Sequence, residues 1–278
     1  MKTLTRRLFT LGTLAGASML ALAAAAQAVT LEEIKSRGVM NIGIVTDQPP
    51  FSFIDAAGAN KGYDIDLTQL IAKELGVEVN YVQVTSANRI SQLQTGRIDL
   101  LAMPFGIFPD RAEVVRYVAP LAQNFEIIYG PKDVALLDVA ALTGHSVGVE
   151  RGSSMDTKVT DSAPEGTVVQ RYDDASSAVQ SLLSGQVEFL GTFSHQFLGV
   201  EAAAPGRFDA KVTLGTSYLG YVVAKNSEEL AGDIADVIKA KIEDGTLEGL
   251  YQQHFGTEFP YKEIPAELNG VTFAISAQ

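Results

Sequence analysis

Short apolar segments alternate with amphipathic segments of helical period in the first half of this chain, and this alternation restricts the fold more than any other feature. Residues 39–45, 77–82 and 98–103 have the composition of strands, and residues 67–75 repeat apolar side chains at helical spacing between the first two. Neighbouring parallel strands need a crossover connection, which such helices provide. The sequence therefore predicts an α/β unit built on a parallel sheet.

A second unit of the same kind is expected to begin near Asn124, because strand-like and helical segments continue to alternate beyond it. The strand-like segments are 125–129, 146–149 and 187–190, and the helical ones are 176–183 and a long terminal helix over 227–242 with its last turns near residue 250. The chain is long enough for one large domain or for two lobes, and its composition does not choose between them.

The first 28 residues have the three parts of an export signal. Lys2, Arg6 and Arg7 form a basic start, an Ala/Leu-rich stretch follows, and Ala26-Gln27-Ala28 supplies a small-x-small cleavage site. We expect residues 1–28 to be removed as a signal peptide, by the twin-arginine or the general route. A membrane anchor is the alternative, but the stretch is only weakly apolar and no charged stop-transfer flank follows it.

The exported chain is expected to be strongly acidic. The sequence has 21 basic and 33 acidic residues, and the signal takes three basic residues with it, which leaves a formal charge of −15. Nucleic acid and anionic lipid are therefore not expected as partners. The sequence contains no cysteine, so neither a disulfide framework nor a lipidated cysteine is available. This favours a soluble periplasmic protein over a membrane-tethered lipoprotein.

The most specific motif follows the first predicted strand. Pro49-Pro50-Phe51-Ser52-Phe53 is followed, nine positions after Phe53, by Gly62-Tyr63-Asp64-Ile65-Asp66-Leu67, a glycine turn with two carboxylates at a helix start. Together with Arg111 and the export signal, this pattern resembles the periplasmic amino-acid-type solute-binding proteins of ABC importers, family 3. The resemblance covers residues 31–256.

The resemblance implies an α/β fold of the two-lobed periplasmic-binding-protein kind (type II). Two hinge strands then join the lobes, and the ligand lies in the cleft between them. By the resemblance, residues 29–122 form lobe 1, residues 123–223 form lobe 2, and residues 224–278 return to lobe 1. The hinges are expected near Ala122 and Val223.

Two arginines are the main candidate ligand-binding residues. Arg111 ends the segment Phe108-Pro109-Asp110-Arg111, where the family has an arginine whose planar fork clamps the ligand carboxylate. A surface arginine paired with a neighbouring acid is the alternative. Ser86 and Arg89 match a segment with which some acidic-amino-acid binders of the family touch a side-chain carboxylate. A solvated arginine at a helix start is the alternative there.

Three further candidates come from the two predicted lobes. Asp47 matches an aspartate that faces the cleft in basic- and polar-amino-acid binders of the family, although a turn-forming aspartate is also consistent with the pattern. Ser153 and Ser154 are expected to open a helix of lobe 2, where backbone N–H groups and a hydroxyl can hold an anion. The resemblance implies that this pair contacts the ligand carboxylate from the opposite side. A serine pair can also simply cap such a helix.

Two departures from the family pattern bear on the ligand. Gly106 stands where the family usually has a hydroxyl, so it can offer only its backbone N–H. Phe193 stands where the family has the aspartate that binds the α-ammonium of the ligand. A buried ammonium without a carboxylate partner is costly. Phe193 therefore predicts a ligand without a free α-ammonium, such as a simple organic acid or a substituted amine.

Catalytic and metal-binding patterns are scarce. His145, His195 and His254 lack ligand spacing and there is no cysteine, so neither a metal nor another cofactor is expected. No nucleophile elbow or Walker-type phosphate loop occurs. The alternative function is that of an enzyme on the same fold, as the cyclohexadienyl dehydratases are. Such an enzyme needs a general acid in the cleft, for which Glu150 and Asp173 are the candidates.

We therefore expect a binding protein rather than an enzyme. The predicted function is that of an extracytoplasmic receptor of an ABC importer, which binds a small carboxylate-bearing solute, an amino acid or a derivative of one, and delivers it to a permease in the inner membrane. We expect it to act in the periplasm as a monomer. A module that senses a ligand and passes the signal to a membrane partner is a third function consistent with the pattern.

Overall fold

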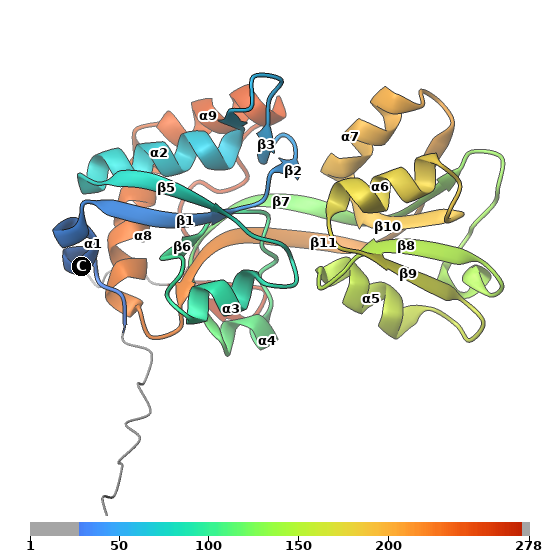
Figure 1. Ribbon diagram of the computed structural model, residues 1–278, viewed down its shortest axis with the longest axis horizontal. Coiled ribbons are helices and arrows are strands. Elements are labelled where there is room, and N and C mark those ends of the chain that lie inside the picture. The colour runs from blue at the N-terminus through green and yellow to red at the C-terminus, as the bar shows by residue number, and fades with distance from the viewer. Residues whose placement is uncertain (1–27, 274–278) are drawn as a thin grey trace, which may run out of the picture.

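Two α/β lobes are joined by two long antiparallel strands, β7 (Val115–Pro131) and β11 (Phe208–Ala224), as Figure 1 shows. This computed structural model describes residues 28–273. Of the predicted signal peptide, only Ala28 lies within the described residues. The two-lobed α/β architecture expected from the sequence is confirmed.

Lobe 1 has a parallel sheet with helices on both faces (Figure 1). Strand β1 pairs in parallel with β5 and with β6, as the alternation of segments predicted. The strands are β1 (Val39–Ile44), β5 (Glu78–Gln83) and β6 (Leu100–Leu101), with the short strands β2 (Asp47–Gln48), β3 (Ser52–Ile54), β4 (Asn60–Lys61), β12 (Glu267–Leu268) and β13 (Val271–Thr272) outside that sheet. The helices are α1 (Leu31–Arg37), α2 (Tyr63–Leu75), α3 (Arg89–Gln94), α4 (Pro109–Ala112), α8 (Glu228–Glu243) and α9 (Thr246–Phe255).

Lobe 2 repeats this arrangement on a smaller scale. Strand β8 pairs in parallel with β9 and with β10, and β10 pairs antiparallel with β7. The strands are β8 (Ser146–Glu150), β9 (Val168–Tyr172) and β10 (Phe189–Phe193), and the helices are α5 (Ser154–Ser162), α6 (Ala175–Leu183) and α7 (Ser194–Ala203) with a 3₁₀ turn at Val139–Leu142. Because β7 and β11 belong to both lobes, the strands form one continuous sheet in the order β5-β1-β6-β11-β7-β10-β8-β9.

Helix ends follow local signals, and one of them corrects the sequence prediction. Thr30 and Glu33 form a capping box at the start of α1, and Gly38 ends that helix with a φ of 77°. The single long terminal helix expected from the sequence is wrong, because Gly245, also at a φ of 77°, separates α8 from α9. Glycine adopts this left-handed conformation without the strain that a Cβ atom causes. The two helices then pack against each other and against α2.

The predicted lobe boundaries fall within the two crossing strands. Ala122 on β7 pairs with Leu219 on β11, whereas Val223 pairs with Arg116, nearer to lobe 1. A hinge at Ala122 therefore lies level with Leu219, four positions before the boundary expected on β11. The boundaries themselves stay predictions.

The proline-rich motif forms the loop before β3, and this loop packs against the first residues of α2. Tyr63 and Asp64 donate their backbone N–H groups to the carbonyls of Pro50 and Phe51, each at 2.9 Å. A Cβ at Gly62, whose φ is 117°, would lie 2.3 Å from the carbonyl oxygen of Phe51. Only glycine therefore permits this close approach, and the motif has a structural role.

Asp64 is buried inside lobe 1 rather than exposed at the helix end. Its carboxylate accepts hydrogen bonds from the hydroxyls of Tyr221 at 2.7 Å and Ser52 at 3.4 Å. Burial nevertheless raises the pKa of Asp64 from 3.8 to about 7. The cost of desolvation thus outweighs both the two hydrogen bonds and the favourable helix end.

We predict that Asp64 makes the protein less stable as the pH rises. Between pH 4 and 7 the unfolded state loses a proton that the folded state keeps, so the free energy of unfolding falls through that window and is constant above it. As the pH rises from 4 to 7, the free energy of unfolding of Asp64→Asn should increase relative to that of the wild type by up to about 4 kcal/mol. Urea unfolding at pH 4, 5.5 and 7.5 measures the difference. Asp161→Asn, on the exposed side of α5, is the control, and a difference that does not change with pH would contradict this prediction.

Candidate ligand-binding site

A small cavity lies between the closed lobes, where side chains from both lobes and from the crossing strands meet. Its free volume is about 10 Å³, which is room for about one water molecule. The lining residues are Gln48, Ser86, Arg89, Pro104, Gly106 and Arg111 from lobe 1, Glu150, Ser153, Ser154 and Phe193 from lobe 2, and Asn124 and Leu219 from β7 and β11. Any solute larger than water therefore enters only when the lobes separate.

The structure brings most of the sequence-predicted binding residues to this cavity. Those that line it are Ser86, Arg89, Gly106, Arg111, Ser153, Ser154 and Phe193. Asp47 does not line it. Its carboxylate instead accepts a hydrogen bond from the backbone N–H of Ser176 at 3.0 Å, in the first turn of α6 in the other lobe. Asp47 thus connects the two lobes beside the cavity, and ligand binding by the other residues stays a prediction.

Both predicted arginines lie against the ring of Phe105. The guanidinium carbon of Arg89 is 4.8 Å from the ring centroid and that of Arg111 is 4.9 Å from it. Arg111 also donates a hydrogen bond to the carbonyl of Gly106 at 3.3 Å and lies 5.1 Å from the ring centroid of Phe108. Cation–π contact stabilises each guanidinium, but a ring carries no charge to balance them.

The charges of these two arginines are not compensated by direct ion pairs. Within residues 28–273, neither has a carboxylate oxygen at ion-pair distance, in contrast to Arg37, Arg116 and Arg171. Arg89 is buried, and its Nε has no hydrogen-bond partner in that part of the chain. Burial, and next the nearby charge of Arg111, lower the pKa of Arg89 to about 9, and burial lowers that of Arg111 as well. The cavity is thus a place where an anion is strongly favoured.

Glu150 is the acidic side chain that lines the cavity among the described residues. It stands at the end of β8 and accepts a hydrogen bond from the amide of Gln48 in lobe 1 at 3.4 Å. Burial raises its pKa to about 7, although a hydrogen bond with Ser86 and the charge of Arg89 act in the opposite direction. Near neutral pH, Glu150 can therefore carry either a proton or a charge. Asp173, the other candidate acid, is exposed and pairs with Arg151.

The serine pair forms the lobe 2 side of the cavity. The hydroxyl of Ser153 accepts a hydrogen bond from the backbone N–H of Asp156 and so caps α5. Ser154 donates its hydroxyl to Glu126 at 3.3 Å, and Glu126, which is fully buried, also forms an ion pair with Lys158. Both serines thus have structural partners in addition to their place in the cavity wall.

Gln48 and Asn124 line the cavity but were missed by the sequence reasoning. Gln48 directly follows Asp47. The sequence analysis thus identified the right region, the end of the first predicted strand, but selected Asp47 instead of its neighbour Gln48. Asn124 is a buried amide within the largely apolar β7, and its side-chain oxygen accepts hydrogen bonds from the hydroxyl of Ser194 and the backbone N–H of Phe125. A buried polar side chain in an otherwise apolar strand was the available signal.

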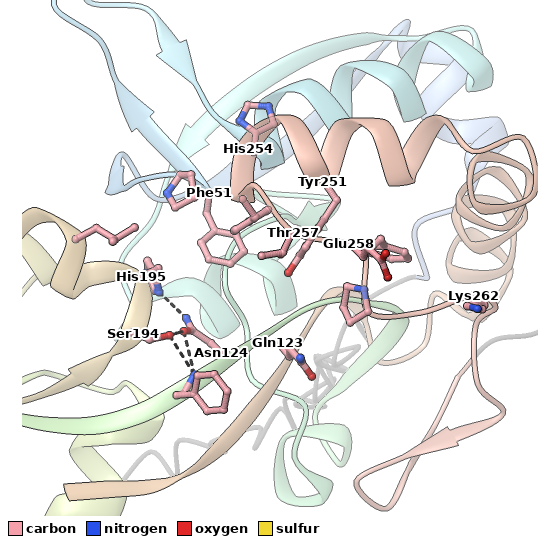
Figure 2. Close-up of a pocket in the computed structure, with 16 residues that line it drawn as sticks. Phe51, Gln123, Asn124, Ser194, His195, Tyr251, His254, Thr257, Glu258 and Lys262 are labelled. Atoms are coloured by element: carbon pink, nitrogen blue, oxygen red, sulfur yellow. Dashed lines mark hydrogen bonds between the residues drawn. The ribbon is translucent and has the colours of Figure 1, made fainter. Parts of the chain in front are cut away.

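A wider groove of about 830 Å³, which Asn124 also lines, lies beside the crossing strands (Figure 2). Its walls include the aromatic rings of Phe51, Tyr251 and Phe255. His195 packs edge to face on Phe51 at a centroid distance of 5.0 Å, and burial lowers its pKa to about 3. His195 is therefore uncharged where the two lobes meet.

Residues 28–273 contain no group of three or more histidine, cysteine or acidic side chains arranged to hold a metal ion. No helix in the described part of the chain has the length and apolar character needed to cross a membrane.

Hydrogen bonds join the two lobes across the cavity. Arg89 donates to the carbonyl of Gly152 at 3.3 Å, and this bond adds to the Gln48–Glu150 bond. Gly152 has a φ of 73° and lies directly opposite Ala87, where an added Cβ would come within 3.2 Å of the Ala87 Cα. Two lobes that close in this way on a charged cavity define a protein that binds a solute by enclosing it.

The comparison with protein families agrees with this class. A family model for bacterial extracellular solute-binding proteins, family 3, matches residues 40–257. The chain belongs to that family. The family resemblance inferred from the sequence is thus confirmed.

Similar proteins include one relative found by sequence and two solved structures. The ABC transporter glutamine-binding protein GlnH of Bacillus subtilis is 28% identical over 244 residues, which make up 86% of this chain and 86% of that protein. The solved solute receptor for L-cysteine of Neisseria gonorrhoeae has 28% identity and a TM-score of 0.77, covering 82% of this chain and 94% of that one. The ancestral amino-acid-binding protein AncCDT-1, a precursor of cyclohexadienyl dehydratase, has 29% identity and a TM-score of 0.75, covering 81% and 99%. These relatives are binding proteins, and the non-enzymatic class expected from the sequence is confirmed.

We predict that Gly152→Ala opposes full closure of the lobes. The new Cβ would lie 3.2 Å from the Ala87 Cα and 3.3 Å from the carbonyl oxygen of Ser86, both parts of the opposing backbone. Calorimetric titration with a ligand should therefore give a larger Kd for this variant than for the wild type, because closing the lobes must now displace that backbone.

Gly185→Ala is the matched control, because Gly185 has a φ of 75° and open space around its Cβ position. In both variants the alanine must adopt a left-handed backbone conformation, which costs about 1 kcal/mol. Only Gly152→Ala adds a contact across the cavity. Equal Kd values for the two variants would show that Gly152 does not limit closure.

Proposed function

We propose that this protein is the periplasmic, monomeric receptor of an ABC importer, and that it encloses a small carboxylate-bearing solute and delivers it to a permease. The observation that carries the proposal is the pair of arginines in the closed cavity without carboxylate partners among the described residues. A planar guanidinium pairs with a carboxylate through two parallel hydrogen bonds. An anionic solute is the partner that this cavity lacks.

Closure converts ligand binding into a change of shape. Arg89 and Arg111 belong to lobe 1, while Ser153 and Ser154 belong to lobe 2, so a solute that contacts both sets binds the closed form more tightly than the open form. The crossing strands β7 and β11 supply the hinges for this rigid-body movement. The closed form is then the shape that the permease recognises.

A thermal-shift screen of the mature protein tests this proposal. The panel comprises organic acids, L-amino acids, opines and betaines. A ligand at a hundred times its Kd adds about 2.7 kcal/mol of stability to the protein, which is readily detected. If no compound of the panel with a carboxylate shifts the melting temperature, the proposal is refuted.

Arg111→Ala is predicted to remove at least about 3 kcal/mol of binding free energy, more than a hundredfold in Kd, because the buried carboxylate of the ligand loses its charged partner. Arg111→Lys should recover only part of this loss, since an ammonium cannot make the bidentate contact. Isothermal titration calorimetry with the ligand from the screen gives both values. Arg97→Ala, at an exposed position, is the control. An unchanged Kd for Arg111→Ala, with normal folding by circular dichroism, would remove Arg111 from the site.

Phe193 is predicted to select against a free α-ammonium. Its ring lines the cavity at the end of β10, and an aromatic face attracts a diffuse cation by about 0.5 to 2 kcal/mol without replacing the hydrogen bonds of a carboxylate. The wild type should therefore bind deaminated or N-alkylated acids more tightly than the parent L-amino acids, and Phe193→Asp should reverse this order. Submicromolar affinity of the wild type for an unmodified L-amino acid would overturn the inference and make Glu150 the ammonium partner.

A further inference from the structure

We propose that Glu150 takes up a proton as the lobes close, so that the receptor binds its solute together with a proton. This inference rests on the proposed function and deepens it, because it adds a regulation to the same site. A receptor of this kind holds its solute most tightly at acidic pH and releases it more readily as the pH rises.

The first support is the position of Glu150 between the two lobes. It ends β8 of lobe 2 and lines the cavity, where it is 7% exposed. The amide of Gln48 donates a hydrogen bond to its carboxylate at 3.4 Å, and the hydroxyl of Ser86 forms another hydrogen bond with the carboxyl group. Both partners belong to lobe 1. Separation of the lobes therefore removes these contacts and returns the carboxyl group to water.

The second support is that the closed surroundings disfavour the charge of Glu150. Arg89, at the start of α3, favours the ionised form, whereas Asp47 of β2 and Asp174 at the N-cap of α6 disfavour it. Burial has the largest effect and acts in the same direction as the two aspartates. Together these effects raise the pKa of Glu150 from 4.5 to about 7.

Other charged side chains on the neighbouring elements are largely paired with one another. These ion pairs are Arg151–Asp173, Arg171–Asp156 and Lys158–Glu126. Strand β10, which pairs with β8, has the sequence Phe189 to Phe193 without an ionisable side chain. Arg111, the other cation that lines the cavity, faces the rings of Phe105 and Phe108. The proton affinity of Glu150 thus depends mainly on burial and on Arg89.

An anionic solute adds to the proton uptake. Its carboxylate brings a negative charge into the cavity and cancels part of the attraction that Arg89 exerts on an ionised Glu150. Both effects raise the pKa of Glu150 further. The free volume of about 10 Å³ leaves little room for water to reduce them. Closure on a bound anion therefore favours the protonated acid more strongly than closure alone.

The sign of the pH dependence follows from these two states. In the open form, the carboxyl group in water is expected near its ordinary pKa of 4.5, and in the closed form its pKa is about 7. Acid therefore favours the closed, liganded form. Between these values the Kd should rise by up to about tenfold for each unit of pH, and it should become constant at higher pH.

Isothermal titration calorimetry from pH 5.5 to 8 measures this dependence. The probes are carboxylates of the screening panel, beginning with pyruvate, L-glutamine and glycine betaine, whose carboxyl groups stay ionised throughout this range. We expect the Kd of the wild type to rise at least about tenfold between pH 5.5 and 7. Glu150→Gln has nearly the shape of the protonated acid. It should abolish this rise and bind more tightly than the wild type at pH 8.

Titrations at pH 7 in buffers of different ionisation enthalpy count the protons. The wild type should show net proton uptake, and it should exceed the uptake of Glu150→Gln by about half a proton or more. His195, which packs on Phe51 of lobe 1, acts in the opposite direction because burial lowers its pKa to about 3. The difference between the two proteins removes this contribution. Asp161→Asn, at an exposed position of α5, is the control and should match the wild type.

The outcomes separate this inference from the proposed function. A Kd that does not change with pH, or no proton uptake by the wild type, would overturn the proton link while a carboxylate-binding receptor stands. Weaker binding by Glu150→Gln at every pH would also overturn it, because Glu150 would then be the charged partner of a cationic group on the solute. If Glu150→Gln does not fold, the uptake by the wild type at pH 7 remains decisive. Absence of binding by every carboxylate of the panel would refute the proposed function, and this inference with it.

Discussion

The antiparallel pairing of β7 with β11 is the interaction on which the rest of the structure depends. Each strand has 17 residues, and the pairing extends from Val115 opposite Ala224 to Pro131 opposite Phe208. Strand β6 of lobe 1 adds to one edge of this ribbon and β10 of lobe 2 adds to the other. The register shifts along β11 bend the ribbon where it passes from lobe to lobe. The placement of the cavity residues of lobe 1 relative to those of lobe 2 thus depends on this pair of strands.

The cavity is costly for the protein to maintain. Two like charges are held against one aromatic ring, and an acid beside them has its pKa raised by burial to about 7. Such groups do not stabilise a fold when they have no direct partner. Their presence between the lobes is the reason why we propose a charged solute. If the proposed solute binds there, ligands without a negative charge leave the arginines unbalanced and bind more weakly.

Much of the fold could be predicted from the sequence, because strand and helix periods alternate clearly and the capping box at Thr30 is a local signal. The break at Gly245 could not, since a single glycine within a helical pattern also occurs inside helices. Arg89, Arg111 and the serine pair could be placed near one another through their motifs. The roles of Glu150 and Asp47 could not, because each depends on a partner from the other lobe, and no local pattern specifies how far the lobes close.

The order of the chain in the two lobes has a consequence for biogenesis. Lobe 2 is one uninterrupted stretch, whereas lobe 1 is assembled from both ends of the chain. Leu230, Ile234 and Ile238 of α8 join Met40 and Ile42 of β1 in a single core. During synthesis from the N-terminus, lobe 2 can complete its core first. The core of lobe 1 is complete only after the last helices have been made. A chain truncated before α8 would contain all of lobe 2, but the apolar core of lobe 1 would be exposed and prone to aggregation.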